Sequence, residues 1–153
     1  MNNLLDMAED VLKNRDLNFS RIDENEIIAS LSEHYTLSIV LRPDYELLHF
    51  SNDLNLVCPD DKLAVLEDSI IKANERIWMG HFDLLSSGNR IVYSFTLPFV
   101  FSLLFDESNF ESLIDLVYTE SDRFFHYFNM IISGKDIPNF SISSLFQDSA
   151  GEA

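Results

Sequence analysis

Two neighbouring segments of alternating polarity constrain the fold of this chain more than any other feature of its sequence. In "YTLSIVL" (35–41) and "ELLHFSNDLNLVC" (46–58), apolar residues alternate with mostly polar ones. A period of two predicts β-strands with one buried face and one face toward water, an arrangement that favours antiparallel pairing. The sequence "RPDY" (42–45) between them predicts a tight hairpin turn.

Three more strands follow from similar patterns. One is predicted at "EIIASL" (26–31), before the first hairpin. The other two, "HFDLL" (81–85) and "RIVYSFTL" (90–97), flank the turn sequence "SSGN" and predict a second hairpin.

Apolar residues at helical spacing predict three helices. The first covers residues 3–14. We expect the second to be capped by an aspartate after Pro59 and to be followed by Gly80 at its C′ position. A capping box, S-x-x-E, starts the third helix at Ser108, and Gly134 ends it.

The resulting order is helix, three strands, helix, two strands, helix. It predicts an α+β fold with a single antiparallel β-sheet and helices packed on one of its faces. A length of 153 residues suits one domain, which we expect over 1–147, with a loose C-terminal tail at 148–153. Thirteen phenylalanines predict an aromatic core.

The net charge of −16 bears on the possible partners. Nucleic-acid binding needs clustered Lys and Arg, and the ten basic residues of this chain are scattered, so we expect no nucleic-acid partner. Anionic membranes are disfavoured for the same reason. The most apolar run, "FTLPFVFSLLF" (95–105), is too short to span a bilayer as a helix and contains Pro98.

Cys58 is the single cysteine, so no internal disulfide or CxxC zinc motif can form. We expect a buried, inert thiol and a cytoplasmic location, because the N-terminus also lacks the pattern of a signal peptide. His34, His49 and His126 have no metal-ligand spacing, so no metal or cofactor is expected. Glu120 and Arg123 have the spacing of an ordinary surface ion pair on a helix.

The segment "NERIWMGHFDL" (74–84) changes from helical to strand periodicity at its glycine. His81 and Asp83 lie two residues apart on one strand face, where the carboxylate could orient the imidazole in a small enzyme or a ligand pocket. Alternatively, His81 bonds the free carbonyls that end the second helix, and Trp78 packs beneath the junction. The chain has no P-loop, GxGxxG, HExxH, GxSxG or EF-hand motif, so we favour the structural interpretation and expect no enzyme.

Apolar residues continue after Pro98 in "PFVFSLLF" (98–105), beyond the end of the predicted strand. They form either a buried strand and connector or an exposed strip that contacts another chain. On the third helix, Phe125 lies off the main apolar stripe. The candidate partner-contact residues are Leu103, Phe105, Phe125 and Phe128.

The block "ANERIWMGHFDL" (73–84) resembles the YbjN-domain family, in which a helix ends close to "INERLWLGHFDLW". The residues that match this pattern are Asn74, Glu75, Arg76, Trp78, Gly80, His81, Phe82, Asp83 and Leu84. "YELLHF", "ESDRFFHYFNMIISGK" and the final "GEA" stand in the family's order, so the resemblance covers nearly the whole chain. This chain departs from the family at 93–95, where "YSF" replaces a basic "FRH", and in the apolar "PFVFSLLF" that replaces a polar loop.

The resemblance implies a fold like that of type III secretion chaperones, α-β-β-β-α-β-β-α, in proteins that are often dimeric. It also implies a noncatalytic role, because members are labelled sensory transduction regulators and supply no catalytic residue. We therefore expect a cytoplasmic protein-interaction module that binds another protein or its own copy as a homodimer.

Overall fold

The computed structural model describes residues 3–98 and 106–134. The helices and strands within these ranges are α1 (Asn3–Asn14), β1 (Phe19–Asp23), β2 (Glu26–Ser30), β3 (Thr36–Arg42), β4 (Leu47–Val57), α2 (Leu63–Asn74), β5 (His81–Leu85), β6 (Arg90–Pro98) and α4 (Glu107–Ser133). Short 3₁₀ turns at Pro43–Tyr45 and Asp60–Lys62 precede β4 and α2. The predicted tail and the segment after Pro98 lie outside the described residues.

The strands form one antiparallel sheet in the order β1-β2-β3-β4-β6-β5, so β1 and β5 are its edges. The predicted α+β class with a single antiparallel sheet is confirmed. The sheet has one strand more than the sequence indicates, because β1 was not predicted. All five residues of β1 are exposed or only half-buried, so the strand lacks the strict alternation of β3 and β4.

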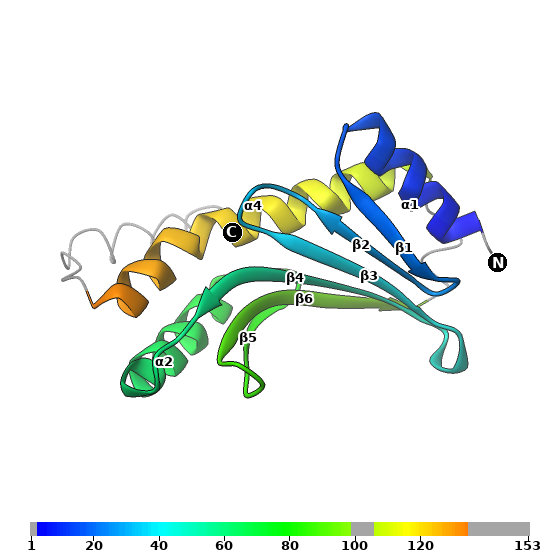
Figure 1. Cartoon of the computed structure of the whole chain (residues 1–153). Helices are drawn as coiled ribbons and strands as arrows, with labels where there is room; N and C mark the ends of the chain where they lie inside the picture. Colours follow the sequence, from blue (N-terminus) through cyan, green and yellow to red (C-terminus); the bar gives the residue numbers. More distant parts are fainter. Residues whose placement is uncertain (1–2, 99–105, 135–153) are drawn as a thin grey trace.

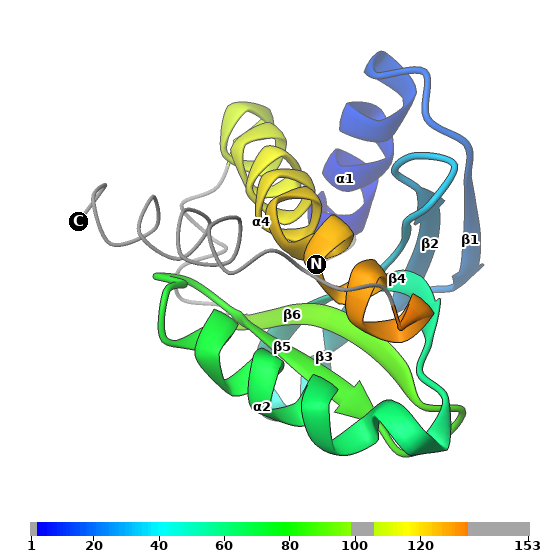
Figure 2. The same ribbon diagram turned by 90° about the vertical axis from the view of Figure 1, so that its left-hand side faces the viewer.

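One face of the sheet packs against helices. Figure 1 shows α1 and α4 on the same side of the sheet, and Figure 2 shows α2 lying next to β5. Alternate residues of β3 are buried on this side, as the period of two predicts. The core beneath α4 is aromatic, as expected, with the Phe50 ring 4.7 Å from Phe95 and the Phe82 ring 5.1 Å from Phe128.

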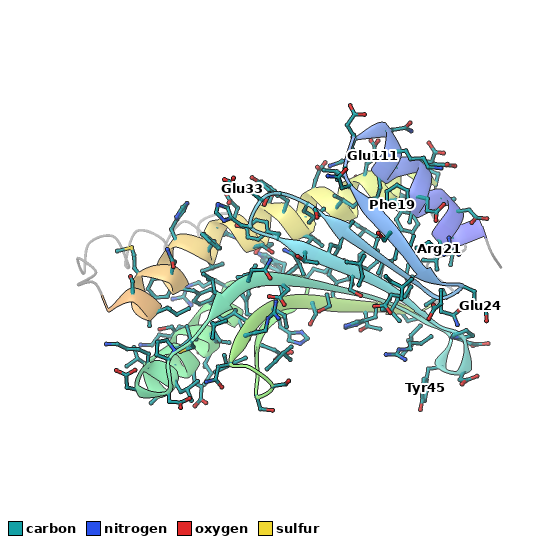
Figure 3. All side chains as sticks on the ribbon, viewed as in Figure 1. Phe19, Arg21, Glu24, Glu33, Tyr45 and Glu111 are labelled. Carbon is teal, nitrogen blue, oxygen red and sulfur yellow. The ribbon has the colours of Figure 1, made fainter. Side chains whose placement is uncertain are left out.

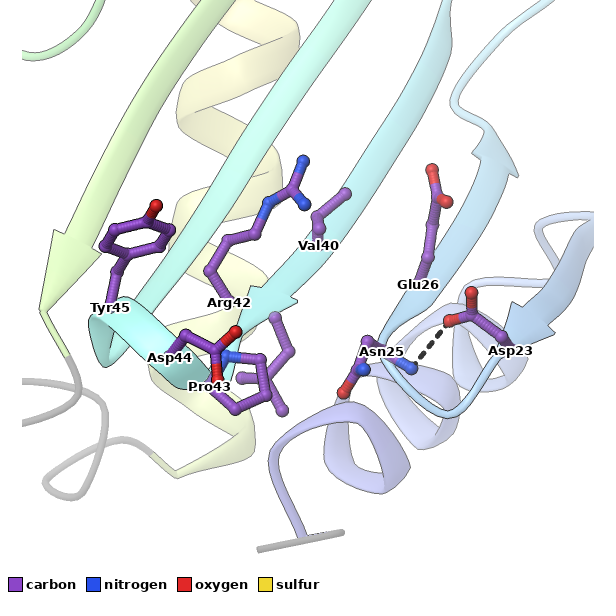
Figure 4. Close-up of a pocket in the computed structure, with 9 residues that line it drawn as sticks. Asp23, Asn25, Glu26, Val40, Arg42, Pro43, Asp44 and Tyr45 are labelled. Atoms are coloured by element: carbon purple, nitrogen blue, oxygen red, sulfur yellow. Dashed lines mark hydrogen bonds between the residues drawn. The ribbon is translucent and has the colours of Figure 1, made fainter.

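We call the opposite side of the sheet the open face. In Figure 4, which views this side, α1 and α4 lie behind the sheet. Cross-strand register places Ser38, Ser51, Ser94 and His81 side by side in one row across β3, β4, β6 and β5. Parallel rows bring together Val40, His49 and Thr96, and Asp53, Val92 and Asp83. The open face therefore combines hydroxyl, imidazole and carboxylate groups with scattered aliphatic side chains.

Two helix starts differ from the sequence prediction, and one predicted helix end is confirmed. The N-cap of α4 is Asp106, whose side chain accepts a hydrogen bond from Asn109 N at 2.9 Å, rather than Ser108. No aspartate caps α2, because a 3₁₀ turn separates Pro59 from the helix. Gly134 ends α4 in a left-handed conformation, as predicted.

Candidate functional site

The junction between α2 and β5 contains most of the matched family motif. α2 ends at Asn74, and the Asn74 side chain then bonds the backbone of Phe82 on edge strand β5. Phe82 N donates to Asn74 Oδ1 at 2.7 Å, and Asn74 Nδ2 donates to the Phe82 carbonyl oxygen at 3.0 Å. A side-chain amide thus satisfies a backbone donor and acceptor that point away from β6, where another strand could otherwise pair.

Gly80 is required by a close backbone approach rather than by the end of α2, which lies before Glu75. Its φ of +76° is in the left-handed region. A Cβ atom here would lie 2.8 Å from both the Ser94 carbonyl oxygen and the Tyr93 hydroxyl. That hydroxyl donates to the Met79 carbonyl oxygen at 2.5 Å. Burial raises the pKa of Tyr93, so the hydroxyl stays a donor.

His81 and Asp83 form the predicted pair on the open face, with His81 Nε2 2.8 Å from Asp83 Oδ2. Both side chains are about half exposed. The expectation that His81 bonds the carbonyls ending α2 is wrong: within the described part of the chain its hydrogen bond goes to Asp83, because α2 ends seven residues earlier. The two cavities described below are lined by other residues.

His49 lies one row from His81 on the same face. Its Nδ1 is 2.8 Å from the Thr96 hydroxyl oxygen. Burial lowers the pKa of His49, and the nearby positive charges of Arg42 and His81 contribute to the shift. This part of the open face therefore holds two imidazoles, each bonded to a different oxygen.

Trp78 is the motif residue that the subunit does not bury. Its side chain is 82% exposed, so the expectation that it packs beneath the junction is wrong. The ring makes no aromatic contact with any of the residues in 3–98 and 106–134. Exposed tryptophan of this kind is uncommon in a monomer and common at the centre of protein interfaces.

Two of the candidate partner-contact residues are inside the subunit. Phe125 is 8% exposed and packs against Tyr35 and His34, and Phe128 is fully buried against Phe82. The expectation that Phe125 is exposed is corrected, because the segment before β3 covers it. Leu103 and Phe105 lie outside the described residues, and their role stays a prediction.

The remaining polar candidates have structural contacts. Arg123 Nη1 lies 2.9 Å from Glu120 Oε1, as the spacing predicts, but both side chains are largely buried rather than on the surface. Cys58 is buried as expected, and burial raises the pKa of its thiol, which keeps it protonated. No group of three potential metal ligands occurs among the described residues.

Two cavities open on the described surface. One, of about 320 Å³, lies between the β1–β2 and β3–β4 turns and contains the guanidinium of Arg42 (Figure 4). The other, of about 350 Å³, lies between α4 and the segment that follows α1, where Arg15 pairs with Asp115 at 2.9 Å. Sequence reasoning missed Arg42, because a single arginine at the end of a strand has no pattern that marks it.

None of the described helices is long and apolar enough to cross a bilayer. Figure 3 shows Tyr45 extending beyond the β3–β4 turn.

Two solved structures of other proteins have a fold similar to that of this chain. The chain resembles the solved structure titled "YbjN, a putative transcription regulator from E. coli", with a TM-score of 0.58 and 12% identity over 84% of this chain and 87% of that chain. It also resembles the "ExsC-ExsE Complex", with a TM-score of 0.54 and 14% identity over 82% of this chain and 90% of that one. At these identities the likeness shows a shared fold, that of type III secretion chaperones.

No curated protein sequence matches the chain significantly. The profile of the YbjN family, described as "Putative bacterial sensory transduction regulator", matches residues 4–130. This match includes every element from α1 to most of α4, and with it the junction around Asn74, Gly80 and Phe82. The chain therefore belongs to the YbjN family.

Proposed function

We propose that this protein is a noncatalytic, cytoplasmic regulatory module that acts by binding another polypeptide, either a partner protein or a second copy of itself. The observation that carries this proposal is the exposure of Trp78. Asn74, Gly80 and Phe82 of the same motif are occupied by contacts within the subunit, whereas Trp78 presents most of its ring to solvent. A surface of this kind gains free energy when a partner removes it from water.

The open face supplies further exposed apolar area. Val57, Arg90 and Leu85 lie side by side across β4, β6 and β5, and both aliphatic side chains are exposed. Arg90 is held between them by Asp53 at 2.6 Å. Apolar side chains together with an arginine are compatible with a protein interface, where arginine is enriched relative to the rest of the surface.

The fold likeness to a structure solved as a protein–protein complex supports the same class of function. The family description, a sensory transduction regulator, is compatible with regulation by binding. The net charge of −16 keeps the free protein soluble and favours a partner with basic groups.

The alternative is a small enzyme or ligand-binding domain that uses His81 and Asp83. The 2.8 Å contact between them favours an oriented imidazole. However, both side chains are half exposed on a sheet surface, and catalysis needs a site that excludes water and a nucleophile or substrate polariser within reach. The pair is better explained as a surface contact between two residues of the same strand.

A test compares wild-type protein with Trp78→Ala, and with Val65→Ala as a control for loss of an exposed apolar side chain on α2. Partners captured from a bacterial extract at low salt are quantified by mass spectrometry, and self-association is followed by sedimentation velocity. We expect the Trp78 variant to lose the partner or the dimer and the Val65 variant to retain it. Equal behaviour of all three proteins, or a wild type that stays monomeric and captures nothing, would contradict the proposal.

A further inference from the structure

The cavity at the β1–β2 and β3–β4 turns is lined by an exposed arginine, Arg42. Nine residues line it: Asp23, Asn25, Glu26, Val40, Leu41, Arg42, Pro43, Asp44 and Tyr45. Figure 4 shows Glu26, Val40 and Arg42 projecting on the open face of the sheet, with the Pro43–Tyr45 turn at its end. Its volume of about 320 Å³ is within the range of small ligand sites.

Every other arginine of the chain pairs with a carboxylate. These contacts are Arg15–Asp115 at 2.9 Å, Arg21–Glu9 at 3.1 Å, Arg76–Glu75 at 3.5 Å, Arg90–Asp53 at 2.6 Å and Arg123–Glu120 at 2.9 Å. Arg42 has no ion pair with any of the described residues, although three carboxylates line the same cavity. Arg42 is therefore an exposed arginine whose charge no neighbouring carboxylate of the described residues neutralises.

Local hydrogen bonds explain in part why two of these carboxylates do not pair with Arg42. Asp23 Oδ1 accepts a bond from Asn25 N at 2.7 Å, which holds the carboxylate in the β1–β2 turn (Figure 4). Glu26 Oε1 accepts a bond from the Ser38 hydroxyl at 3.0 Å, which holds that side chain toward the neighbouring strand. Both carboxylates are thus oriented by their own neighbours, and the guanidinium of Arg42 keeps its donors for a ligand.

The chemistry of the lining selects the class of ligand. A guanidinium binds carboxylate in a planar, often bidentate geometry. Glu26 and Asp44 have no ion pair with other described residues, so the same cavity offers acceptors for a cationic group. A purely anionic ligand such as nucleic acid would meet three carboxylates and one guanidinium, and would be repelled. The lining also includes the apolar side chain of Val40 and the aromatic ring of Tyr45, which is 75% exposed.

From this arrangement we infer that the cavity receives a polypeptide segment in which an acidic side chain, bound by Arg42, lies next to a basic side chain, bound by Glu26 or Asp44. The inference rests on the proposed function, because it states the chemistry of the partner. It adds a second contact area that shares no lining residue with Trp78.

The probes are the capped dipeptides Ac-Asp-Lys-NH₂, Ac-Asp-Gln-NH₂ and Ac-Asn-Lys-NH₂, titrated into ¹⁵N-labelled full-length protein and followed by NMR. We expect the first to shift the backbone amides of residues 23–26 and 40–45 and to bind more tightly than the two singly charged probes. Arg42→Gln should weaken its binding about tenfold, equal to the loss of one charged hydrogen-bonded contact. Arg76→Gln, at an arginine paired with Glu75, is the matched control and should leave binding unchanged.

Shifts that are spread over the surface, or that are the same in Arg42→Gln as in the wild type, would overturn the inference. So would equal binding of all three probes. The Arg42→Gln spectrum itself reports whether the variant is folded. Trp78→Ala should bind the dipeptide as the wild type does, because Trp78 does not line this cavity. If the dipeptide does not bind but Trp78→Ala loses the partner, only the cavity inference fails. If the dipeptide binds but Trp78→Ala keeps the partner, only the role of Trp78 fails.

Discussion

Asn74 terminates the sheet by occupying both backbone hydrogen-bonding groups of Phe82, with bonds of 2.7 and 3.0 Å. A residue at the end of a helix thereby protects an edge strand. Natural sheets usually protect their edges with charged residues, bulges or covering loops, because an open edge pairs readily with other chains. Here the amide of one asparagine does this near the start of β5, where the Phe82 ring also enters the core.

Replacing Asn74 by alanine should destabilise the protein and promote association. The change removes two hydrogen bonds and leaves the Phe82 N–H and C=O without their partners. We expect a loss of about 2 kcal/mol in the free energy of unfolding, together with concentration-dependent association through β5. Urea denaturation and size-exclusion chromatography measure the two effects.

The matched control for this variant is Asn14→Ala, at the exposed end of α1. It should change the free energy of unfolding by less than about 0.5 kcal/mol. If Asn74→Ala is as stable and as monomeric as this control, the side chain does not protect the edge.

Gly80 and Gly88 offer a second matched comparison. Both have positive φ, +76° and +82°, so alanine is strained at either site. Only at Gly80 would the new Cβ lie 2.8 Å from a backbone oxygen, that of Ser94, whereas at Gly88 it would lie 3.6 Å from the flexible Arg90 side chain. We expect Gly88→Ala to cost about 1 kcal/mol and Gly80→Ala at least about 3 kcal/mol, measured by thermal and urea unfolding.

A similar loss in the two variants would show that the approach between Gly80 and Ser94 relaxes without cost. If Gly80→Ala does not fold, hydrogen exchange of the wild type provides the needed second measurement. The Tyr93 hydroxyl bond to Met79 predicts that this junction exchanges as slowly as the sheet core.

The sequence was sufficient to predict the helices and strands in which buried residues recur at regular spacing. α1 has the predicted bounds, and β3 and β4 lie where their period of two places them. β1 was missed because an edge strand with mostly exposed side chains carries no such signal. The end of α2 was placed too late because Ile77 continues the helical spacing and Gly80 follows it, although the chain already turns at Glu75.

The candidate site was harder to predict, because it depends on contacts between distant segments. The His81–Asp83 pair could be predicted, since two residues on one strand face are always neighbours. The exposure of Trp78 and the burial of Phe125 could not, since both depend on what the rest of the fold covers. Arg42 stands out only when the ion pairs of every other arginine are known.

Trp78 is the single tryptophan, so its fluorescence reports on one position. Because the side chain is 82% exposed, we expect the emission of the free protein to resemble that of tryptophan in water and to be quenched efficiently by acrylamide. Burial by a partner or a second copy should shift the emission to the blue and reduce quenching. Trp78→Ala should leave the free energy of unfolding within about 0.5 kcal/mol of the wild type.

A blue-shifted, poorly quenched emission at all protein concentrations, with a sedimenting monomer, would contradict the exposure of the ring. The Trp78→Ala variant also distinguishes a role of Trp78 in the fold from a role in binding. A destabilised Trp78→Ala protein would indicate a role in the fold, whereas an unchanged stability with lost association indicates a role in binding.

The environment of His49 predicts a dependence of stability on pH. Burial lowers its pKa in the folded protein below the value of 6.5 expected for the unfolded chain. The unfolded state therefore binds more protons between these two values, so this histidine contributes stability above pH 6.5 that is lost as the pH falls through its folded pKa.

His49→Gln should reduce the loss of unfolding free energy between about pH 7.5 and about pH 5.5, as measured by urea denaturation at each pH. His126→Gln, which replaces an exposed histidine on α4, is the matched control for the loss of an imidazole. An unchanged slope in His49→Gln would mean that His49 protonates equally well in both states, despite its contact with Thr96 and the positive charges of Arg42 and His81 nearby.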